Sequence, residues 1–262
     1  MTNISADEQA AVHAQRGLVL RAAGVCALVG TLAHLVAGVL HGALTAGTSQ
    51  SSSAIIYHHV LATPPWAAVN LVSLLALLVW LAVFVALDCS SRSSLTWRGW
   101  LGRLASIVLG LGIAAATLLY LTDVVTVPAL AEQWATAGPD RRAQLELLGD
   151  TVQIAIRIPL FHTLPILVFG LPFALLGAAH IGQDGVLPTW LGWASLVAGT
   201  TSLITGLSWS LGTTAIPELI LWAGIQPLIW IWGLGAGVAL WRTASRHLPE
   251  RRDSVPRNAG AT

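Results

Sequence analysis

Residues 158–181 limit the possible folds of this chain most strongly, because they hold no aspartate, glutamate, lysine or arginine. Their length of 24 residues exceeds the roughly 20 residues that a helix needs to cross the hydrocarbon core of a bilayer. Arg157 stands at the outer end of this stretch, and His162 follows about one helical turn deeper. The stretch predicts a transmembrane helix that carries polar groups near one end.

Two prolines inside the same stretch alter its hydrogen bonding. Proline has no backbone N–H, so Pro165 and Pro172 cannot donate to the carbonyls of Phe161 and Val168. A helix in lipid has to satisfy its backbone polar groups within the protein. The prolines therefore predict free hydrogen-bond acceptors inside the membrane, which indicates a site.

The composition identifies lipid as the surrounding solvent. Of the 262 residues, 55% are hydrophobic and only 10% are charged, compared with about 25% charged residues in soluble domains. All 13 basic residues are arginine, which excludes a lysine Schiff base. The net charge of +1 provides no basic face for nucleic acid, and Cys26 and Cys89 show no metal-binding or disulfide spacing. We expect the lipid bilayer as a partner and no nucleic acid.

Hydrophobic runs and their polar boundaries predict six transmembrane helices. The first run is longer than the apolar region of a cleaved signal peptide, so we expect it to be retained. The predicted spans are residues 22–40 (continuing to about 46), 67–87, 104–122, 158–181, 186–209 and 218–241. The sequence thus predicts an all-α fold, a polytopic bundle of six transmembrane helices at 17–243, between an N-terminal segment at 1–16 and an arginine-bearing tail at 244–262.

The connecting segments are interpreted from their polar composition. Residues 48–66 are expected to form a polar loop, and a second, longer loop is expected to follow the third span after Asp123. Residues 138–157 predict an amphipathic helix in this third loop, lying at the membrane surface and leading into the fourth span. Its polar side carries Arg142, Glu146, Asp150, Gln153 and Arg157.

Arginines are distributed unevenly between the predicted loops. Ten lie before the first helix, between the second and third helices, or after the last, whereas Arg141, Arg142 and the helix-end Arg157 lie on the other side. The positive-inside rule then places both termini in the cytoplasm of a multi-pass protein of the cell membrane. Tryptophans near predicted helix ends fit an interfacial belt. They are Trp66, Trp97, Trp100, Trp190, Trp193, Trp209 and Trp241.

Several short motifs of the chain resemble those of a family of membrane proteins. They are RAAGV at 21–25, RLA at 103–105, the leucine-rich residues 144–148, GVLPTWLGW at 185–193 and Ala198-Gly199. With these motifs, residues 18–240 resemble a bacterial family of six-helix membrane proteins catalogued as a domain of unknown function. The family pattern has a basic residue where this chain has Thr189. The resemblance implies the fold and a location in the bacterial inner membrane, and it supplies no catalytic residues.

Ionisable groups of the predicted spans fall near one level of the membrane. A rise of about 1.5 Å per residue sets the depth of each group relative to the helix ends. The outermost turns together hold His34, His41, Tyr120, Asp123, Arg157, His162 and Glu218. Such groups usually face the bundle interior or water, so we predict that these residues form an outward-facing polar pocket.

Three classes of function remain open. The first is binding or transport of an ion or a small or amphiphilic molecule, for which an interrupted helix is a known device. The second is an intramembrane enzyme or redox protein with a metal ion or haem. Its candidate ligands are His34, His41, His58, His59 and His162. The third is an accessory subunit whose ion pairs fix helix register, and among the three we rank binding or transport first.

Each candidate residue also has a purely structural interpretation. Gly30 and Gly38 share a helix face with His34 and His41, which also fits close packing of helices. Arg157 also fits a residue whose side chain extends from a helix end toward the membrane surface.

Two contacts distinguish the functional interpretation from the structural one. We expect Arg157 to pair with Asp123 or Glu218, because all three share one depth. We also expect His34 and His162 to face each other in the pocket, where they would hold a metal ion or relay protons.

Overall fold

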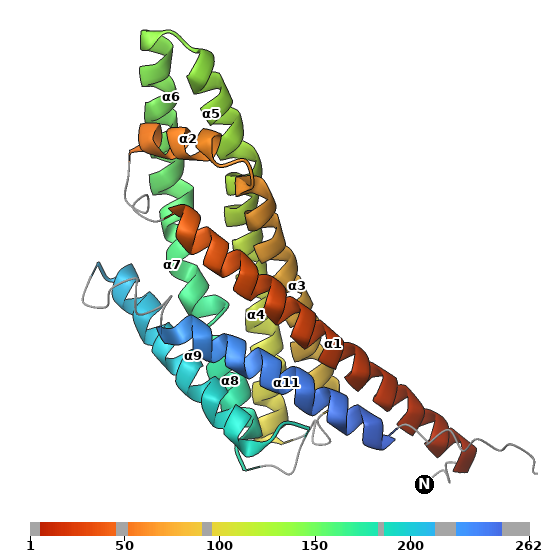
Figure 1. Cartoon of the computed structure of the whole chain (residues 1–262). Helices are drawn as coiled ribbons and strands as arrows, with labels where there is room; N and C mark the ends of the chain where they lie inside the picture. Colours follow the sequence, from red (N-terminus) through yellow and green to blue (C-terminus); the bar gives the residue numbers. More distant parts are fainter. Residues whose placement is uncertain (1–5, 46–51, 91–95, 183–185, 213–223, 248–262) are drawn as a thin grey trace, which may run out of the picture.

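The computed structural model describes residues 6–45, 52–90, 96–182, 186–212 and 224–247. Within these ranges every regular element is a helix, and no strand occurs. Figure 1 shows an elongated bundle with three of the shorter helices gathered at one end. These three are α2 (Ser53–Ala62), α5 (Val127–Thr136) and α6 (Pro139–Val152).

Four helical stretches within the described chain are long and apolar enough to cross a membrane. They are Ala14–Leu40, Trp66–Ser90, Trp97–Thr136 and Pro139–His180. The first lies within α1 (Ala6–Thr45), which begins inside the segment predicted to be polar, and the second is α3. The chain is therefore an all-α membrane protein, as its composition predicts.

The predicted fifth and sixth spans correspond to α9 (Thr189–Ser210) and α11 (Gln226–His247). α9 is rich in serine, threonine and glycine, so it is less apolar than the four long stretches. α9 packs against α8 (Leu171–His180), and α11 packs along α1. Residues 218–223 lie outside the described residues, and the total of six spans stays a prediction.

Two of the long stretches contain a widened helical turn near the middle. One runs through α4 (Trp97–Leu121), η1 (Thr122–Thr126) and α5, and the other runs through α6, η2 (Gln153–Arg157) and α7 (Ile158–Leu167). Both η elements are turns of π-helix, in which backbone bonds reach back five residues. A 40-residue helix is about 60 Å long, twice the roughly 30 Å core of a bilayer. α5 and α6 are therefore long enough to extend beyond the membrane.

The helices α2, α5 and α6 form a small domain that we call the lobe (Figure 1). Its apolar core includes Tyr57, Trp134 and Leu145. Tyr57 also donates a hydrogen bond of 3.0 Å to the carbonyl of Leu145. Gly149 allows α2 to cross α6 closely, because a Cβ at this position would lie only 2.6 Å from Oγ of Ser53.

The lobe corrects the expectations for the loops. The middle of the predicted polar loop at 48–66 is the helix α2, and the chain after Asp123 continues as a helix through α5. The helix predicted to lie at the surface, residues 138–157, is α6 with η2, and it pairs with α5 and α2. The prediction of a helix there is confirmed, and this helix continues through η2 directly into α7 instead of standing apart from the fourth span.

The polar stripe of α6 explains this arrangement. Glu146 accepts a hydrogen bond of 2.7 Å from Nε1 of Trp134 on α5. Asp150 accepts one of 2.6 Å from Oγ of Ser53, at the first residue of α2. Arg142 donates from Nε to the carbonyl of Trp134 over 3.1 Å. The polar face therefore binds the other helices of the lobe.

The predicted fourth span is interrupted at residues 168–170, between α7 and α8. Pro165 lies inside α7, and the N–H of Phe169 donates to the carbonyl of Leu164 (3.2 Å) instead of to that of Pro165. Ser202 of α9 donates to the Pro165 carbonyl, with its Oγ 2.9 Å away. A neighbouring helix thus satisfies a carbonyl freed at the break, and this carbonyl differs from the two that the proline positions predict.

Glycines allow α9 to lie close to the interrupted span. Three of them recur every seven residues along α9: Gly192, Gly199 and Gly206. A Cβ on Gly199 would lie 2.7 Å from the carbonyl oxygen of Gly170, which is closer than side-chain carbons approach a backbone. This spacing brings α9 near enough for its serine hydroxyls to reach backbone groups of α7 and α8.

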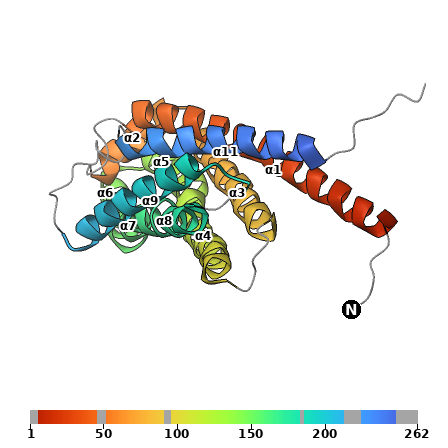
Figure 2. The same cartoon turned by 90° about the horizontal axis from the view of Figure 1, so that it is seen from below.

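The end of the bundle opposite the lobe carries arginine contacts. Arg16 of α1 donates from Nη2 to the carbonyl of Ser90 at the end of α3 (2.6 Å). The guanidinium of Arg21 lies 4.5 Å from the ring centroid of Trp241 on α11. Figures 1 and 2 both show α1 and α11 side by side. The start of α1 and the ends of α3 and α11 therefore share one level.

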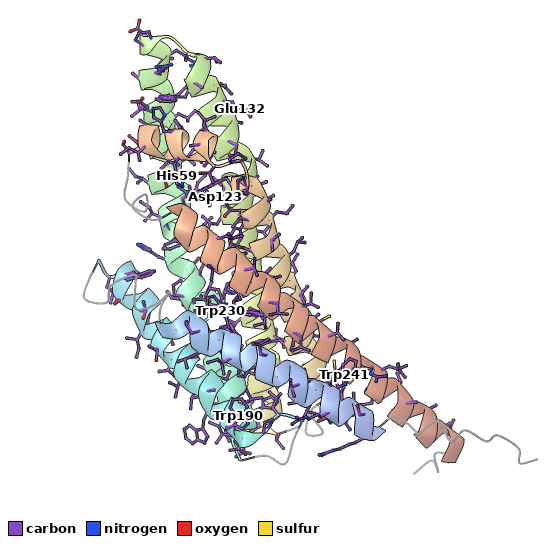
Figure 3. All side chains as sticks on the ribbon, viewed as in Figure 1. His59, Asp123, Glu132, Trp190, Trp230 and Trp241 are labelled. Carbon is purple, nitrogen blue, oxygen red and sulfur yellow. The ribbon has the colours of Figure 1, made fainter. Side chains whose placement is uncertain are left out.

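Most tryptophans predicted for the interfacial belt are exposed. They include Trp97, Trp100, Trp190, Trp193 and Trp241. Figure 3 places Trp190 and Trp241 at the end opposite the lobe. Trp66 does not belong to this belt, because it is buried beneath α2 and α5 in the core of the lobe.

Candidate binding site at the base of the lobe

Each π-turn precedes a proline at the start of the next helix. Pro128 follows η1, and Pro159 follows η2. In η1 the N–H of Val127 bonds the carbonyl of Thr122, and the same five-residue reach closes η2. Proline donates no backbone hydrogen bond and crowds the preceding turn, so it favours a widened turn. The sequence thus places two irregular turns at the base of the lobe.

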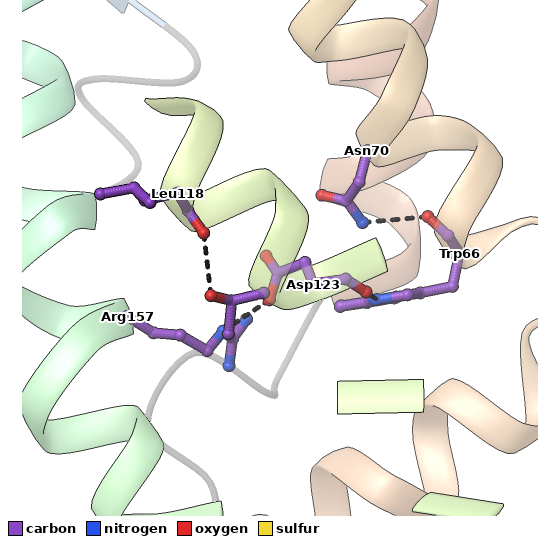
Figure 4. Close-up of polar contacts among 6 residues, drawn as sticks. Trp66, Asn70, Leu118, Asp123 and Arg157 are labelled. Carbon is purple, nitrogen blue, oxygen red and sulfur yellow. Dashed lines mark hydrogen bonds and ion pairs between the residues drawn. The ribbon is translucent and has the colours of Figure 1, made fainter. Parts of the chain in front are cut away.

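An ion pair joins the two π-turns (Figure 4). Nε of Arg157 in η2 lies 2.6 Å from Oδ1 of Asp123 in η1, with 18% and 5% of the two side chains exposed. Residues 104–122 and 158–181 carry no formal charge, so the pair marks the level at which charge begins on both helices. The prediction of an acidic partner for Arg157 is confirmed. Glu218, the other predicted partner, lies outside the described residues.

The backbone of η1 is held by a tryptophan of α3. Nε1 of Trp66 donates to the carbonyl of Asp123 over 2.9 Å. The residue five positions after Asp123 is Pro128, which has no N–H to offer this carbonyl. Trp66 therefore replaces the missing backbone donor, and it fixes the carboxylate of the ion pair relative to α3.

Asn70 lies one turn further along α3 and is 0% exposed. Its Nδ2 donates to the carbonyl of Trp66 over 2.9 Å, whereas its Oδ1 has no hydrogen-bond partner in the described part of the chain. Figure 4 shows this oxygen on the side of the amide away from the Trp66 carbonyl, toward η1. A buried acceptor without a donor costs about 1–3 kcal/mol, so this oxygen marks a place where a ligand can donate.

Tyr120 and Ser73 extend this group into the membrane bundle. Tyr120 lies at the end of α4, three residues before Asp123, and its hydroxyl is close to Ser73 of α3. Ser73 donates from Oγ to the carbonyl of Val69 over 3.0 Å. We define the polar cluster by five residues. They are Trp66, Asn70, Tyr120, Asp123 and Arg157.

His58 and His59 lie in a helix of the lobe and not in a loop. The ring centroid of the exposed His58 is 4.8 Å from that of Trp134. The ring of His59 is 5.9 Å from that of Trp66, and its buried Nε2 has no hydrogen-bond partner among the described residues. Figure 3 shows His59 and Asp123 at similar levels. His59 therefore borders the polar cluster through Trp66.

His34 and His162 have different neighbours. His34 accepts a hydrogen bond at Nδ1 from Nε1 of Trp230 (3.0 Å), and its ring lies beside those of Trp80 and Phe169. His162 lies on α7, with its ring 5.9 Å from that of Trp209 on α9. None of these aromatic neighbours is shared. The structure thus gives no support to a pocket in which the two histidines face each other.

The remaining candidates and the metal alternative gain no support either. The side chain of His41 lies outside the described residues, although its backbone belongs to α1. Across the described side chains, no group of three histidine, cysteine, aspartate or glutamate residues is placed to hold a metal ion. The polar cluster instead combines one cation, one anion and an amide.

The surface around the π-turns is apolar. Val125 in η1 is 60% exposed, and Ile154 in η2 is 71% exposed. Ile158 and Leu121, at the adjoining helix ends, are also exposed. Exposed apolar side chains on membrane-length helices usually face lipid, and here they surround the helix turns that carry the ion pair.

Fold and site together define a helical membrane protein with a buried charged site between a membrane bundle and a lobe. Comparison with protein families, with characterised proteins and with solved structures found no match to this chain. What the site does has to be inferred from its own residues.

Sequence reasoning missed two members of the site. Asn70 is the one asparagine within an uncharged span, and a lone amide at membrane depth was an available signal. Trp66 carried no such signal, because a tryptophan at a helix start also fits the interface. The π-turns were readable from Pro128 and Pro159, each of which stands in a continuous helical pattern.

Proposed function

We propose that this protein binds, and carries, an ion or a small or amphiphilic molecule at the polar cluster. The observation that carries the proposal is the buried pair of Asp123 and Arg157, with each member held on a π-turn. Single π-turns inside α-helices frequently mark functional sites. Charged groups at membrane depth are costly and usually mark the path of a substrate or ion.

The unpartnered oxygen of Asn70 favours ligand binding over a purely structural role. An ion pair that only fixed helix register would need no additional acceptor, yet Oδ1 of this fully buried amide has no donor among the described residues. Buried polar atoms in proteins almost always have a hydrogen-bond partner. A ligand that donates a hydrogen bond would satisfy it.

The interrupted fourth span supports transport rather than static binding. α7 joins η2, which carries Arg157, to the break at residues 168–170. Discontinuous helices are a recurring device of transporters, because the two halves can move relative to each other. In this proposal the part of α7 next to the π-turn moves, while its far end stays bonded to α9 through Pro165 and Ser202 and α8 stays packed on α9.

The proposal includes a topology of six spans in a bacterial inner membrane, with both termini in the cytoplasm and the lobe outside. The arginines at the end opposite the lobe support this orientation under the positive-inside rule. We also propose membership of the six-helix family that the motifs resemble. Neither part is required for binding at the polar cluster.

Thermal unfolding of the purified protein in detergent tests the binding function. The probes are monovalent cations, inorganic anions, short zwitterions and single-chain amphiphiles. A ligand that binds the folded state raises the unfolding midpoint with a saturating concentration dependence. We expect at least one probe to do so in the wild type and to lose the effect in Asp123→Asn and Arg157→Gln.

Two exposed residues of α6 provide matched controls. Asp140→Asn and Arg141→Gln make the same chemical changes at exposed positions outside the cluster. Both should respond to the probe as the wild type does. If no probe raises the midpoint of the wild type more than those of the cluster variants, the binding function is wrong.

A further inference from the structure

We infer that the ligand of the polar cluster is a zwitterion with a primary ammonium group and a nearby carboxylate or phosphate. This inference rests on the binding function proposed above and names the chemical class of its ligand. It follows from the charge balance of the site, from its free acceptor and from the exposure of its two charges.

Charge balance favours a ligand that carries both a positive and a negative group. Asp123 and Arg157 neutralise each other, with Nε and Oδ1 2.6 Å apart. A simple cation would take the carboxylate and leave the guanidinium unpaired, and a simple anion would do the reverse. An unpaired charge at low dielectric is strongly unfavourable. A zwitterion gives each member of the pair a new partner at the same time.

The acceptor side of the cluster requires a hydrogen-bond donor. Oδ1 of Asn70 is buried and has no donor among the described residues, and the Asp123 carboxylate lies on the neighbouring η1. A primary ammonium group carries three N–H donors, enough for both acceptors. A quaternary ammonium group carries none, so it would leave the amide oxygen unsatisfied. The site should therefore discriminate ethanolamine from choline.

The donor side of the cluster fits an anion. The guanidinium of Arg157 has five N–H donors in a planar fork, and its Nε is the atom that lies 2.6 Å from Oδ1 of Asp123. This fork matches the geometry of carboxylate and phosphate oxygens. Arg157 is also the more exposed member, at 18% against 5% for Asp123. The anionic group therefore lies toward the surface and the ammonium group lies deeper, beside Asn70.

Two sources can supply this chemistry. A soluble amino acid or phosphoethanolamine would enter from the aqueous side of the lobe. The headgroup of phosphatidylethanolamine would enter from the bilayer, past the exposed Val125 and Ile154 that flank the pair. The recognised group is the same in both cases, and the two sources differ only in whether the probe has to be presented in a membrane.

The experiment compares phosphoethanolamine with its two halves. Thermal unfolding of the full-length protein in detergent at pH 7 is followed with phosphoethanolamine, ethanolamine, inorganic phosphate and phosphocholine. Glycine serves as a second zwitterion. We expect phosphoethanolamine or glycine to raise the midpoint, with an affinity at least about tenfold above that of ethanolamine, phosphate or phosphocholine. Nanodiscs of phosphatidylethanolamine and of phosphatidylcholine supply the lipid arm.

Asn70→Leu is the informative variant. It removes the unsatisfied acceptor together with the hydrogen bond from Nδ2 to the Trp66 carbonyl, and the fold should tolerate this better than a change of either charge. We expect this variant to lose most of its preference for phosphoethanolamine over phosphocholine, while Arg141→Gln keeps it. Stabilisation only by phosphatidylethanolamine nanodiscs supports the inference with lipid as the source.

Other outcomes separate this inference from the proposed function. If ethanolamine or phosphate alone stabilises the protein as well as phosphoethanolamine does, the ligand is a simple ion, and binding stands while the zwitterion inference is wrong. Equal effects of the ethanolamine and choline probes overturn the requirement for a primary ammonium. A lack of response to every ion, zwitterion and amphiphile overturns the binding function itself.

Discussion

At the residue scale, the site depends on a few buried polar atoms whose partners come from different helices. Trp66 of α3 satisfies the carbonyl of Asp123, and Asp123 in turn neutralises Arg157 of η2. Each of these groups is costly to bury alone. Their contributions to stability are therefore coupled, and removal of one affects the others.

Removal of one member of the ion pair should destabilise the fold more than removal of both. Arg157→Ala or Asp123→Ala leaves an uncompensated buried charge, which costs about 3–5 kcal/mol. In the double variant neither charge remains, so we expect a smaller loss than the sum of the two. Chemical or thermal unfolding in detergent measures this coupling.

The exposed residues Asp140 and Arg141 serve as controls for that double-mutant cycle. Their alanine variants should lie within about 0.5 kcal/mol of the wild type. Additive effects of Asp123→Ala and Arg157→Ala would show that the pair contributes no coupling energy, contrary to its burial.

Tyr57 in the lobe should make stability fall at high pH. Burial raises the pKa of its phenol above the ordinary value of about 10, and the charges of Asp150 and Glu146 raise it further. The folded state therefore holds the proton more tightly than the unfolded state. This contribution is complete below about pH 10 and is lost as the pH rises through the folded pKa.

Tyr57→Phe isolates that effect. The chain has no lysine and only two tyrosines, so few other groups titrate in this range. Between pH 8 and 11 we expect the unfolding midpoint of the wild type to fall more steeply than that of the variant. Parallel curves for the two proteins would contradict a raised pKa for this phenol.

At the element scale, the fourth span depends on donors from its neighbour. Its break at residues 168–170 frees the carbonyl of Pro165, and Ser202 of α9 donates to it. The glycines of α9 bring the two backbones close enough for this bond. The interrupted helix is therefore stable only while α9 remains packed against it.

Ser202→Ala should destabilise the protein by about 1–3 kcal/mol, because it leaves a buried carbonyl without a donor. Thr201→Ala is the matched control, since Thr201 is half-buried and its hydroxyl bonds within its own helix, to the carbonyl of Val197. Unfolding midpoints in detergent measure both. Equal midpoints for the two variants would mean that the Pro165 carbonyl finds another donor.

At the scale of the whole molecule, the proposed topology places the lobe outside the cell. Single cysteines at Thr136 in the lobe and at Ser245 near the end of α11 test it, after Cys26 and Cys89 have been replaced. We expect an impermeant maleimide to label the Thr136 position in intact cells and the Ser245 position only after permeabilisation. The opposite pattern would invert the topology.

Hydropathy predicted most of the membrane bundle, because uncharged runs of sufficient length have few alternatives to a transmembrane helix. Depth counting along the helices also paired Arg157 with an acidic group. The lobe was missed because Ser53 and Tyr57 owe their helical environment to α6, which is distant in sequence. Contacts such as that between Ser202 and Pro165 are likewise tertiary, so no local pattern encodes them.

The two π-turns and their ion pair also lie at the base of the lobe, so a small rotation there moves the far end of the lobe by a larger distance. α6 has 14 residues and is about 21 Å long, so a rotation of about 10° at its base moves its tip by nearly 4 Å. A small shift of the ion pair, in which one salt-bridge partner is exchanged for another, thus produces a larger displacement at the tip of α6. Binding of a ligand at the buried site would then change the position of the tip of the lobe, and this change could be detected from the aqueous phase.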